Sequence, residues 1–183
     1  MNGYKRTGFV CFFAAILLGA TGTEIHAEDL AERIHRAAIE MTEAFQKEDS
    51  KALLRFTAEP LVRKAGGETA LKQRLEKEFA ANRKEDLRLV SYSFIKPDRI
   101  HYSHGMLFAL IERKSNWLYE KKPMALRYNL LAVSIDGGAT WRFAEASSIS
   151  EDHFRSLFGF LDAQLFSEFY QYTSDRAGCK KQP

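Results

Sequence analysis

Four histidine or carboxylate side chains in segments predicted to be strands could move a proton or bind a metal: His101, His104, Glu112 and Glu145. An isomerase- or dehydratase-like site needs an acid or a histidine in an apolar pocket, because burial tunes its pKa for proton transfer. An offset of three residues puts His101 and His104 on opposite faces of a strand, which argues against a shared metal. Glu112 and Glu145 are expected near strand ends, facing water. The sequence therefore predicts no catalytic residue and no metal site.

Aromatic residues are the stronger candidates for a binding role. Trp117, Tyr119 and Tyr128 lie in segments predicted to be strands. Such side chains could line a pocket, because ligand sites are mostly apolar and carry few polar groups. Ordinary packing in the core is the alternative interpretation, since aromatic residues routinely fill cores.

The first 27 residues have the pattern of a secretory signal peptide. Lys5 and Arg6 precede an apolar run, Phe9–Ala20, and the small residue Ala27 closes a plausible cleavage site. The apolar run is short for a membrane span, so we expect cleavage and no stable span afterwards. Cleavage leaves one cysteine, Cys179, in a polar tail over residues 173–183 that we expect to be flexible, so no internal disulfide is predicted.

Composition and motifs exclude several classes of function. The chain has 183 residues and a net charge of +3, which is too balanced to favour nucleic-acid binding. It contains no phosphate-binding loop, no dinucleotide fingerprint and no G-x-S-x-G elbow, and no cofactor is predicted. One domain over residues 28–172 is the expectation for this length.

The hydrophobic pattern predicts helices first and strands afterwards. Apolar residues recur at helical spacing in three segments, Glu28–Lys47, Lys51–Phe56 and Glu68–Asn82, the second capped by Asp49 or Ser50 and ended by Glu59-Pro60. From Leu87 the period changes to two, which predicts four extended segments: Leu87–Lys96, Ile100–Tyr119 with a bulge or bend at Gly105, Met124–Ile135 and Ala139–Ala146. Both faces of several strands are apolar, so the sheet is covered on both sides or curved enough to enclose one face.

The last two strands flank a predicted hairpin with the pattern S-x-D-x-G-x-x-W, formed by Ser134, Asp136, Gly138 and Trp141. Asp-Gly-Gly favours a tight turn because glycine accepts positive φ, and the Asp136 carboxylate can accept turn N–H groups. The pattern resembles the Asp-box hairpin repeated in sialidase propellers. Here it occurs once, which favours a structural role over sugar binding.

An aromatic-rich helix is predicted over Ser150–Tyr172, with Ser150 as its N-cap. One apolar stripe is sufficient to pack this helix on the sheet. Phe160, Phe166 and Tyr170 lie off that stripe and predict a second contact, either a homodimer interface or a lid over a pocket.

A longer set of residues resembles a group of small bacterial proteins with the NTF2-like fold, which also includes ketosteroid isomerase. The resemblance covers roughly Ala31–Ala146 and rests on Asp49, Leu53-Leu54, Glu59-Pro60-Leu61-Val62, Gly66-Gly67, Ser134, Asp136-Gly137-Gly138 and Thr140-Trp141-Arg142-Phe143. It implies an α+β cone in which N-terminal helices pack against a strongly curved antiparallel sheet. Where ketosteroid isomerase would have its first acid, this chain has Val62-Arg63-Lys64, which contains no carboxylate and so argues against an enzyme of that kind.

We therefore expect a periplasmic or secreted, non-catalytic module that binds a small apolar ligand or a protein partner, and that forms a homodimer. The alternative is an isomerase- or hydrolase-like enzyme of the same fold, with an acid or a histidine inside the cone.

Overall fold

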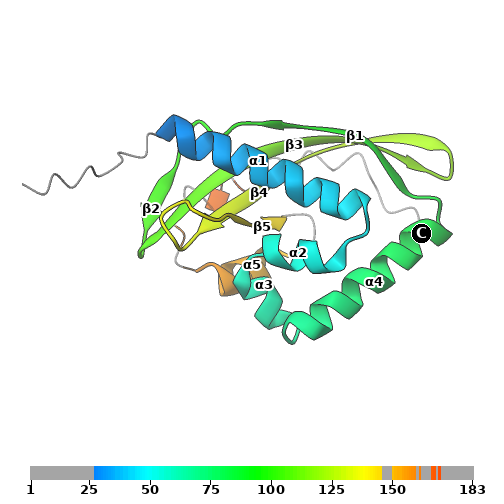
Figure 1. Cartoon of the computed structure of the whole chain (residues 1–183), viewed down its shortest axis with the longest axis horizontal. Helices are drawn as coiled ribbons and strands as arrows, with labels where there is room; N and C mark the ends of the chain where they lie inside the picture. Colours follow the sequence, from blue (N-terminus) through cyan, green and yellow to red (C-terminus); the bar gives the residue numbers. More distant parts are fainter. Residues whose placement is uncertain (1–26, 146–149, 160, 162–165, 168, 170–183) are drawn as a thin grey trace, which may run out of the picture.

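The computed structural model describes residues 27–145, 150–159, 161, 166–167 and 169. The predicted signal peptide, the tail over residues 173–183, Phe160 and Tyr170 lie outside these residues, apart from Ala27, where the first helix begins. The fold is α+β: four helices precede a five-stranded antiparallel sheet (Figure 1). The elements are α1 Ala27–Gln46, α2 Ser50–Phe56, α3 Glu59–Lys64, α4 Glu68–Lys84, β1 Arg88–Ile95, β2 His101–Ser103, β3 Met106–Tyr119, β4 Lys122–Ser134, β5 Arg142–Glu145 and α5 Glu151–Leu157.

The N-terminal helices begin and end close to the predicted positions. The Asp49 side chain accepts the N–H of Ala52 and caps α2. The helix α3 is not among the predicted elements, because the sequence Glu59-Pro60 predicts only the end of the preceding helix. Proline fits the first turn of a helix, where its missing N–H would have no partner, and Pro60 occupies that position in α3.

The sheet has the order β1-β3-β4-β5, and β2 also pairs with β3. The β3–β4 ladder is unbroken from the pair Leu107–Ser134 to the pair Tyr119–Lys122. Strong curvature requires bulges or glycine kinks, and this central ladder contains no register shift. The sheet is accordingly not strongly curled, which corrects the expected shape.

Two details of the predicted strands were wrong. The segment Ile100–Tyr119 is a hairpin of β2 and β3 and not one strand, because His104 and Gly105 both have positive φ and form a two-residue turn. In β1 the register shifts between Leu89 and Ser91, so the simple alternation fails and Val90 is exposed.

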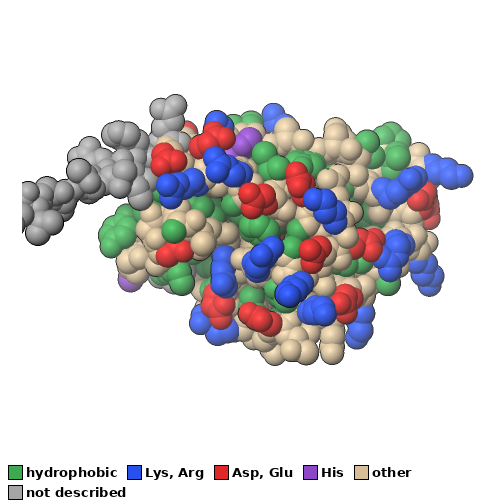
Figure 2. All heavy atoms as spheres, viewed as in Figure 1, with side chains coloured by type: hydrophobic (Ala, Val, Ile, Leu, Met, Phe, Trp, Pro, Cys, Tyr) green, Lys and Arg blue, Asp and Glu red, His purple; other side chains and the backbone are tan. Residues whose placement is uncertain are grey.

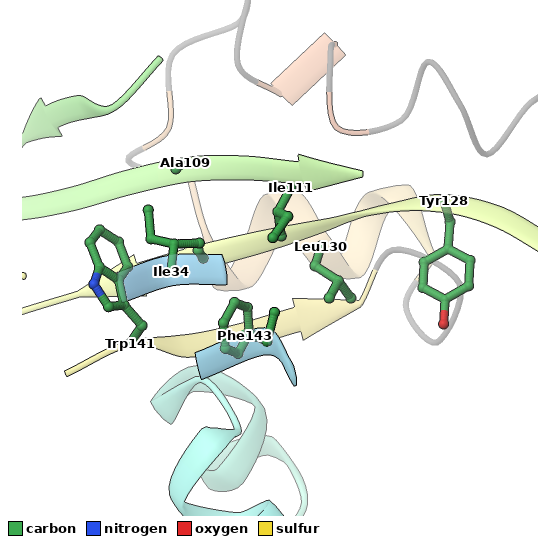
Figure 3. Packing of buried hydrophobic residues seen from close by; sticks show 9 residues of the cluster. Ile34, Ala109, Ile111, Tyr128, Leu130, Trp141 and Phe143 are labelled. Carbon is green, nitrogen blue, oxygen red and sulfur yellow. The ribbon is translucent and has the colours of Figure 1, made fainter. Parts of the chain in front are cut away.

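Each face of the sheet carries its own core. On one face Ile34 and Ala38 of α1 pack against Ala109, Ile111 and their neighbours on β4 and β5 (Figure 3). On the other face, residues of the C-terminal segment complete a second cluster: Phe158, Phe166 and Phe169, with Phe108, Leu131 and Ala144 of the strands. Of the two predicted arrangements, the sheet covered on both sides is the one observed.

The predicted C-terminal helix is interrupted, since α5 ends at Leu157 and Gly159 follows as a turn residue, while Phe166, Ser167 and Phe169 are again helical. Phe166 is buried, and the Arg155 guanidinium carbon lies 3.6 Å from the centre of its ring. Phe166 is therefore part of the core beneath the sheet and not part of an open patch. The face of the molecule in Figure 2 mixes acidic and basic side chains over the helices, without a large patch of one sign.

Hydrogen bonds hold the loop between β4 and β5 in one conformation. Ser134 Oγ donates to Asp136 Oδ1 at 2.7 Å and accepts the N–H of Gly138 at 2.9 Å. The Thr140 N–H and hydroxyl donate to the two Asp136 oxygens at 2.9 and 2.6 Å. β4 and β5 pair from Leu130–Glu145 to Val133–Arg142, so the connection is longer than the tight turn that was predicted. Trp141 is buried beside α1.

The loop also packs on α1 through Gly138. A Cβ added at this position would lie 2.3 Å from Leu30 Cδ2, and the backbone has φ of +90°. Gly137 has φ of +70° with nothing within 4 Å of an added Cβ. An alanine at Gly137 would therefore meet only backbone strain, whereas an alanine at Gly138 would meet both backbone strain and a steric clash.

We predict that Gly137→Ala lowers the free energy of unfolding by about 1 kcal/mol, from backbone strain alone. Gly138→Ala should cost about 1–3 kcal/mol more, because the added methyl group also displaces Leu30. Urea denaturation of both variants measures the difference. Equal losses would show that the contact between the loop and α1 is not tight.

The pKa of Asp136 leads to a second prediction, on how stability depends on pH. Burial alone raises this pKa, but hydrogen bonds from Thr140 and Ser134 outweigh that effect and lower it to about 2. A lowered carboxyl pKa stabilises the fold above the unfolded value of about 3.9, and that stability is lost as the pH falls toward 2. Asp136→Asn should lower the free energy of unfolding by about 1 kcal/mol at neutral pH, because solvent screens the interactions of this exposed group and keeps the loss small. The difference from wild type should shrink between about pH 4 and pH 2, measured by thermal melts. A stability difference between wild type and Asp136→Asn that stays constant with pH would contradict the lowered pKa of Asp136.

Candidate functional site

A cavity of about 720 Å³ lies between the N-terminal helices and one face of the sheet. It starts where the contact of Ile34 and Ala38 with the sheet ends, so the next turns of α1 contribute Met41, Thr42 and Phe45 to its wall. The helices α2, α3 and α4 and the strands β3, β4 and β5 supply the rest. Small-molecule sites commonly measure about 300–1,000 Å³, so the size is suitable for a ligand.

Two of the predicted binding aromatics line this cavity. Trp117 is 9% exposed, donates its indole N–H to Ser115 Oγ at 2.9 Å, and meets the Phe45 ring at 5.7 Å between centroids. Tyr128 is 2% exposed, and its ring lies at the opposite end of the α1-facing cluster from Trp141 (Figure 3). The third, Tyr119, is 39% exposed at the end of β3 and does not line the cavity.

The sheet also places an arginine in the cavity wall. Arg113 is on the face of β3 that carries Ile111 and Trp117, because alternate residues of a strand point the same way. It is 5% exposed, and its guanidinium carbon lies 5.6 Å from the centre of the Tyr128 ring. Its Nε and Nη2 atoms have no hydrogen-bond partner among the residues that the structure describes. Burying these two atoms is costly, because no hydrogen bond from the described residues replaces the hydration that they lose.

Two carboxylates share the cavity with Arg113. Glu78, on α4, is an exposed residue of the cavity wall, where partial desolvation raises its pKa above the usual value and the charge of Glu145, on β5, raises it further. Glu145 was expected to face water. It is the last residue of β5, but it is half-buried and lines the cavity, because it sits opposite Leu130 on the α1-facing side of the sheet. The exposed side chains Lys64 and Arg74 also line the cavity and mark its mouth.

Glu112 lies in the middle of β3 and not near a strand end, which corrects the prediction. Neighbouring residues of a strand face opposite sides, so Glu112 points away from the cavity that Arg113 lines. Its side chain is 11% exposed, with Oε2 2.6 Å from Arg127 Nη2 and Oε1 3.5 Å from Lys114 Nζ. This arrangement is an ion-pair cluster on the far face of the sheet.

The histidines and the hairpin residues also lie outside the cavity lining. His104 is exposed in the β2–β3 turn, with Nδ1 2.7 Å from Ser103 Oγ, and His101 is half-buried in β2. Within the described ranges, no group of three or more His, Cys, Asp or Glu could hold a metal ion. The four hairpin residues singled out in the sequence, Ser134, Asp136, Gly138 and Trp141, belong to the loop and its contact with α1.

Comparison with known proteins assigns neither a family nor a function to the chain. No protein-family model matches the chain, and no curated protein matches it. In the part of the chain that the structure describes, no helix is long and apolar enough to cross a membrane.

Arg113 and Glu78 are two cavity residues that the sequence reasoning missed. For Arg113 a signal was present, because the series Leu107, Ala109 and Ile111 continues by twos to Arg113 and Trp117. A cation among the apolar residues of one strand face is unusual and could have been noticed. Glu78 had no such signal, since its spacing from Arg74 is equally typical of a solvated helix face.

Together these residues describe a mainly apolar space with one buried cation and, elsewhere in its wall, two interacting carboxylates. Such a space can hold an amphipathic molecule whose apolar part contacts Trp117 and its neighbours. Glu78, with its raised pKa, is also a group that could carry a proton.

We predict that Arg113→Met stabilises the ligand-free protein by about 1–3 kcal/mol, because methionine fills a similar volume without a buried unpaired charge. Arg113→Lys keeps the charge and should give no gain. Urea denaturation of protein refolded from denaturant, and so stripped of ligand, compares the two with wild type. A loss of more than 1 kcal/mol in Arg113→Met would mean that the guanidinium holds the fold together.

Proposed function

We propose that this chain is an exported, NTF2-like, non-catalytic module that binds a small apolar ligand in the cavity between its helices and its sheet. The observation that carries the proposal is the cavity of about 720 Å³, whose wall combines Trp117, Tyr128 and aliphatic side chains with a smaller number of polar and charged side chains. Ligand sites have this composition, because apolar contact supplies affinity and a few polar groups supply orientation.

The order of the elements supports the NTF2-like assignment. Helices precede an antiparallel sheet, α1 packs on one face of that sheet, and the cavity opens between them. These features, and not the curvature of the sheet, are the support from the fold. Export to the periplasm or out of the cell rests on the order of charged, apolar and small residues in the first 27 positions.

A second candidate function is acid–base catalysis in the same cavity. The observation that favours it is the pair Glu78 and Glu145, since burial and a neighbouring carboxylate both raise the pKa of Glu78. A carboxylic acid with a raised pKa beside a second carboxylate can donate a proton to a substrate. The two candidates are distinguishable, because Glu78→Gln would abolish turnover in an enzyme and leave ligand retention in a binding module.

Native mass spectrometry of protein purified from its own host tests the proposal. We predict a bound small molecule in the wild type and its absence in Leu126→Trp, because the larger ring occupies the cavity beside Tyr128. The matched control is Val90→Trp, which adds the same ring at a position that is 57% exposed and outside the lining. The same spectra report whether the chain is a monomer or the expected homodimer.

Circular dichroism of both variants shows whether they remain folded. Wild-type protein without any bound molecule, in repeated preparations from the host, would overturn the proposed binding function. Retention of the molecule by folded Leu126→Trp would place its site outside this cavity.

A further inference from the structure

We infer that the cavity selects an apolar monocarboxylate, and that Arg113 binds the carboxylate group of that ligand. The inference rests on the proposed binding function and adds the chemical class of the ligand. It starts from a polar side chain that is 5% exposed, lines the cavity, and has two donor atoms without partners among the described residues.

The identity of the two unpartnered atoms is informative. Nε and Nη2 lie on the same edge of the planar guanidinium, and their N–H groups point in parallel directions. This edge matches the two oxygens of a carboxylate, which can accept both hydrogen bonds at once. The guanidinium carbon lies over the Tyr128 ring at 5.6 Å from its centre, and the edge that carries Nε and Nη2 is buried without a hydrogen-bond partner among the described residues.

The charges of the lining agree with a single anionic group. Lys64, Arg74 and Arg113 are cationic, whereas Glu78 and Glu145 are the acidic residues, which leaves one net positive charge. Neither carboxylate accepts a hydrogen bond from Nε or Nη2 of Arg113. One carboxylate from the ligand would neutralise the net positive charge of the lining and accept hydrogen bonds from both Nε and Nη2.

The remaining wall defines the other end of the ligand. Trp117 shares a strand face with Arg113, and Leu126 and Tyr128 lie next to them on β4, where Tyr128 is the direct partner of Arg113. These residues form an apolar surface beside the guanidinium. A hydrocarbon chain attached to the carboxylate would lie against that surface and lose its contact with water.

The experiment compares decanoate, decan-1-ol and decylamine, which share one alkyl chain and differ in charge. Isothermal titration of refolded wild-type protein should show decanoate binding roughly tenfold to hundredfold more tightly than decan-1-ol, as expected for hydrogen bonds to a buried charge. Decylamine should bind more weakly than either. This comparison needs no variant, so it does not depend on how a substitution folds.

Arg113→Met should reduce decanoate affinity to that of decan-1-ol and leave decan-1-ol affinity within about threefold, because apolar contacts remain. Arg142→Met is the matched control: it removes an arginine that pairs with Glu59 on the surface, outside the cavity, and should keep the preference for the acid. Both variants lose the same net charge.

The failures of the two proposals are distinguishable. Equal wild-type affinity for acid and alcohol, or tighter binding of decylamine, would overturn the role of Arg113 and leave the binding function standing. Wild-type protein that binds none of the three compounds would overturn the assignment of an apolar alkyl ligand and, with it, this inference. Loss of the acid preference in Arg142→Met would show that net charge alone sets it, which also overturns the inference.

Discussion

The register between β3 and β4 determines the composition of the cavity. Their ladder is unbroken from the pair Leu107–Ser134 to the pair Tyr119–Lys122, so every side chain along it has a fixed face. Because strand residues alternate, a slip of one position would move Arg113 to the opposite face and bring Glu112 into the cavity. The hydrophobic residues resist such a slip, since Ile111 and Leu130 are buried against α1 while Phe108 and Leu131 are buried on the other side.

The cavity exists because the helices pack on one another as well as on the sheet. The first part of α1 lies on the strands through Ile34 and Ala38. Farther along, Ala44 joins a separate cluster with Leu53 of α2 and Phe79 of α4. This third cluster fixes α4 to α2, and Figure 1 shows α4 running obliquely to α1. The cavity between these two clusters is therefore bounded by packed helices and strands, as ligand sites that are largely preformed usually are.

Local signals in the sequence predicted a large part of this arrangement. The periodicity of α1, the Asp49 cap of α2 and the pattern around Asp136 each depend on residues close together in the chain, and the structure has all three elements. The β2–β3 hairpin was missed because its turn uses His104 where Asn or Gly is usual, at φ of 51°. The curvature of the sheet was overestimated because curvature depends on bulges between strands, which alternation in one strand does not reveal.

The lining of the candidate cavity could be predicted only in part, for a physical reason. Trp117 and Tyr128 could be named because large aromatic residues in strands are visible candidates, whereas Tyr119 has the same signal and lies at an exposed strand end. Glu145 reaches the cavity only through the pairing of β5 with β4, and Glu78 only through the packing of α4 on α2. Which titratable groups share a space is decided by contacts between distant segments, and the first 27 residues, which motivate export, lie almost entirely outside the described structure.

The most direct test of this account is the environment of the Arg113 Nε–H group itself, observed by nuclear magnetic resonance in ligand-free protein and during titration. Because Nε has no hydrogen-bond partner among the described residues, we expect its resonance to move downfield on addition of decanoate and to move little on addition of decan-1-ol. Backbone amides of Trp117 and Tyr128 should respond to both compounds, because both fill the cavity. An Arg113 Nε–H resonance that does not respond to decanoate, while those amides do, would contradict the claim that this buried guanidinium is the binding group.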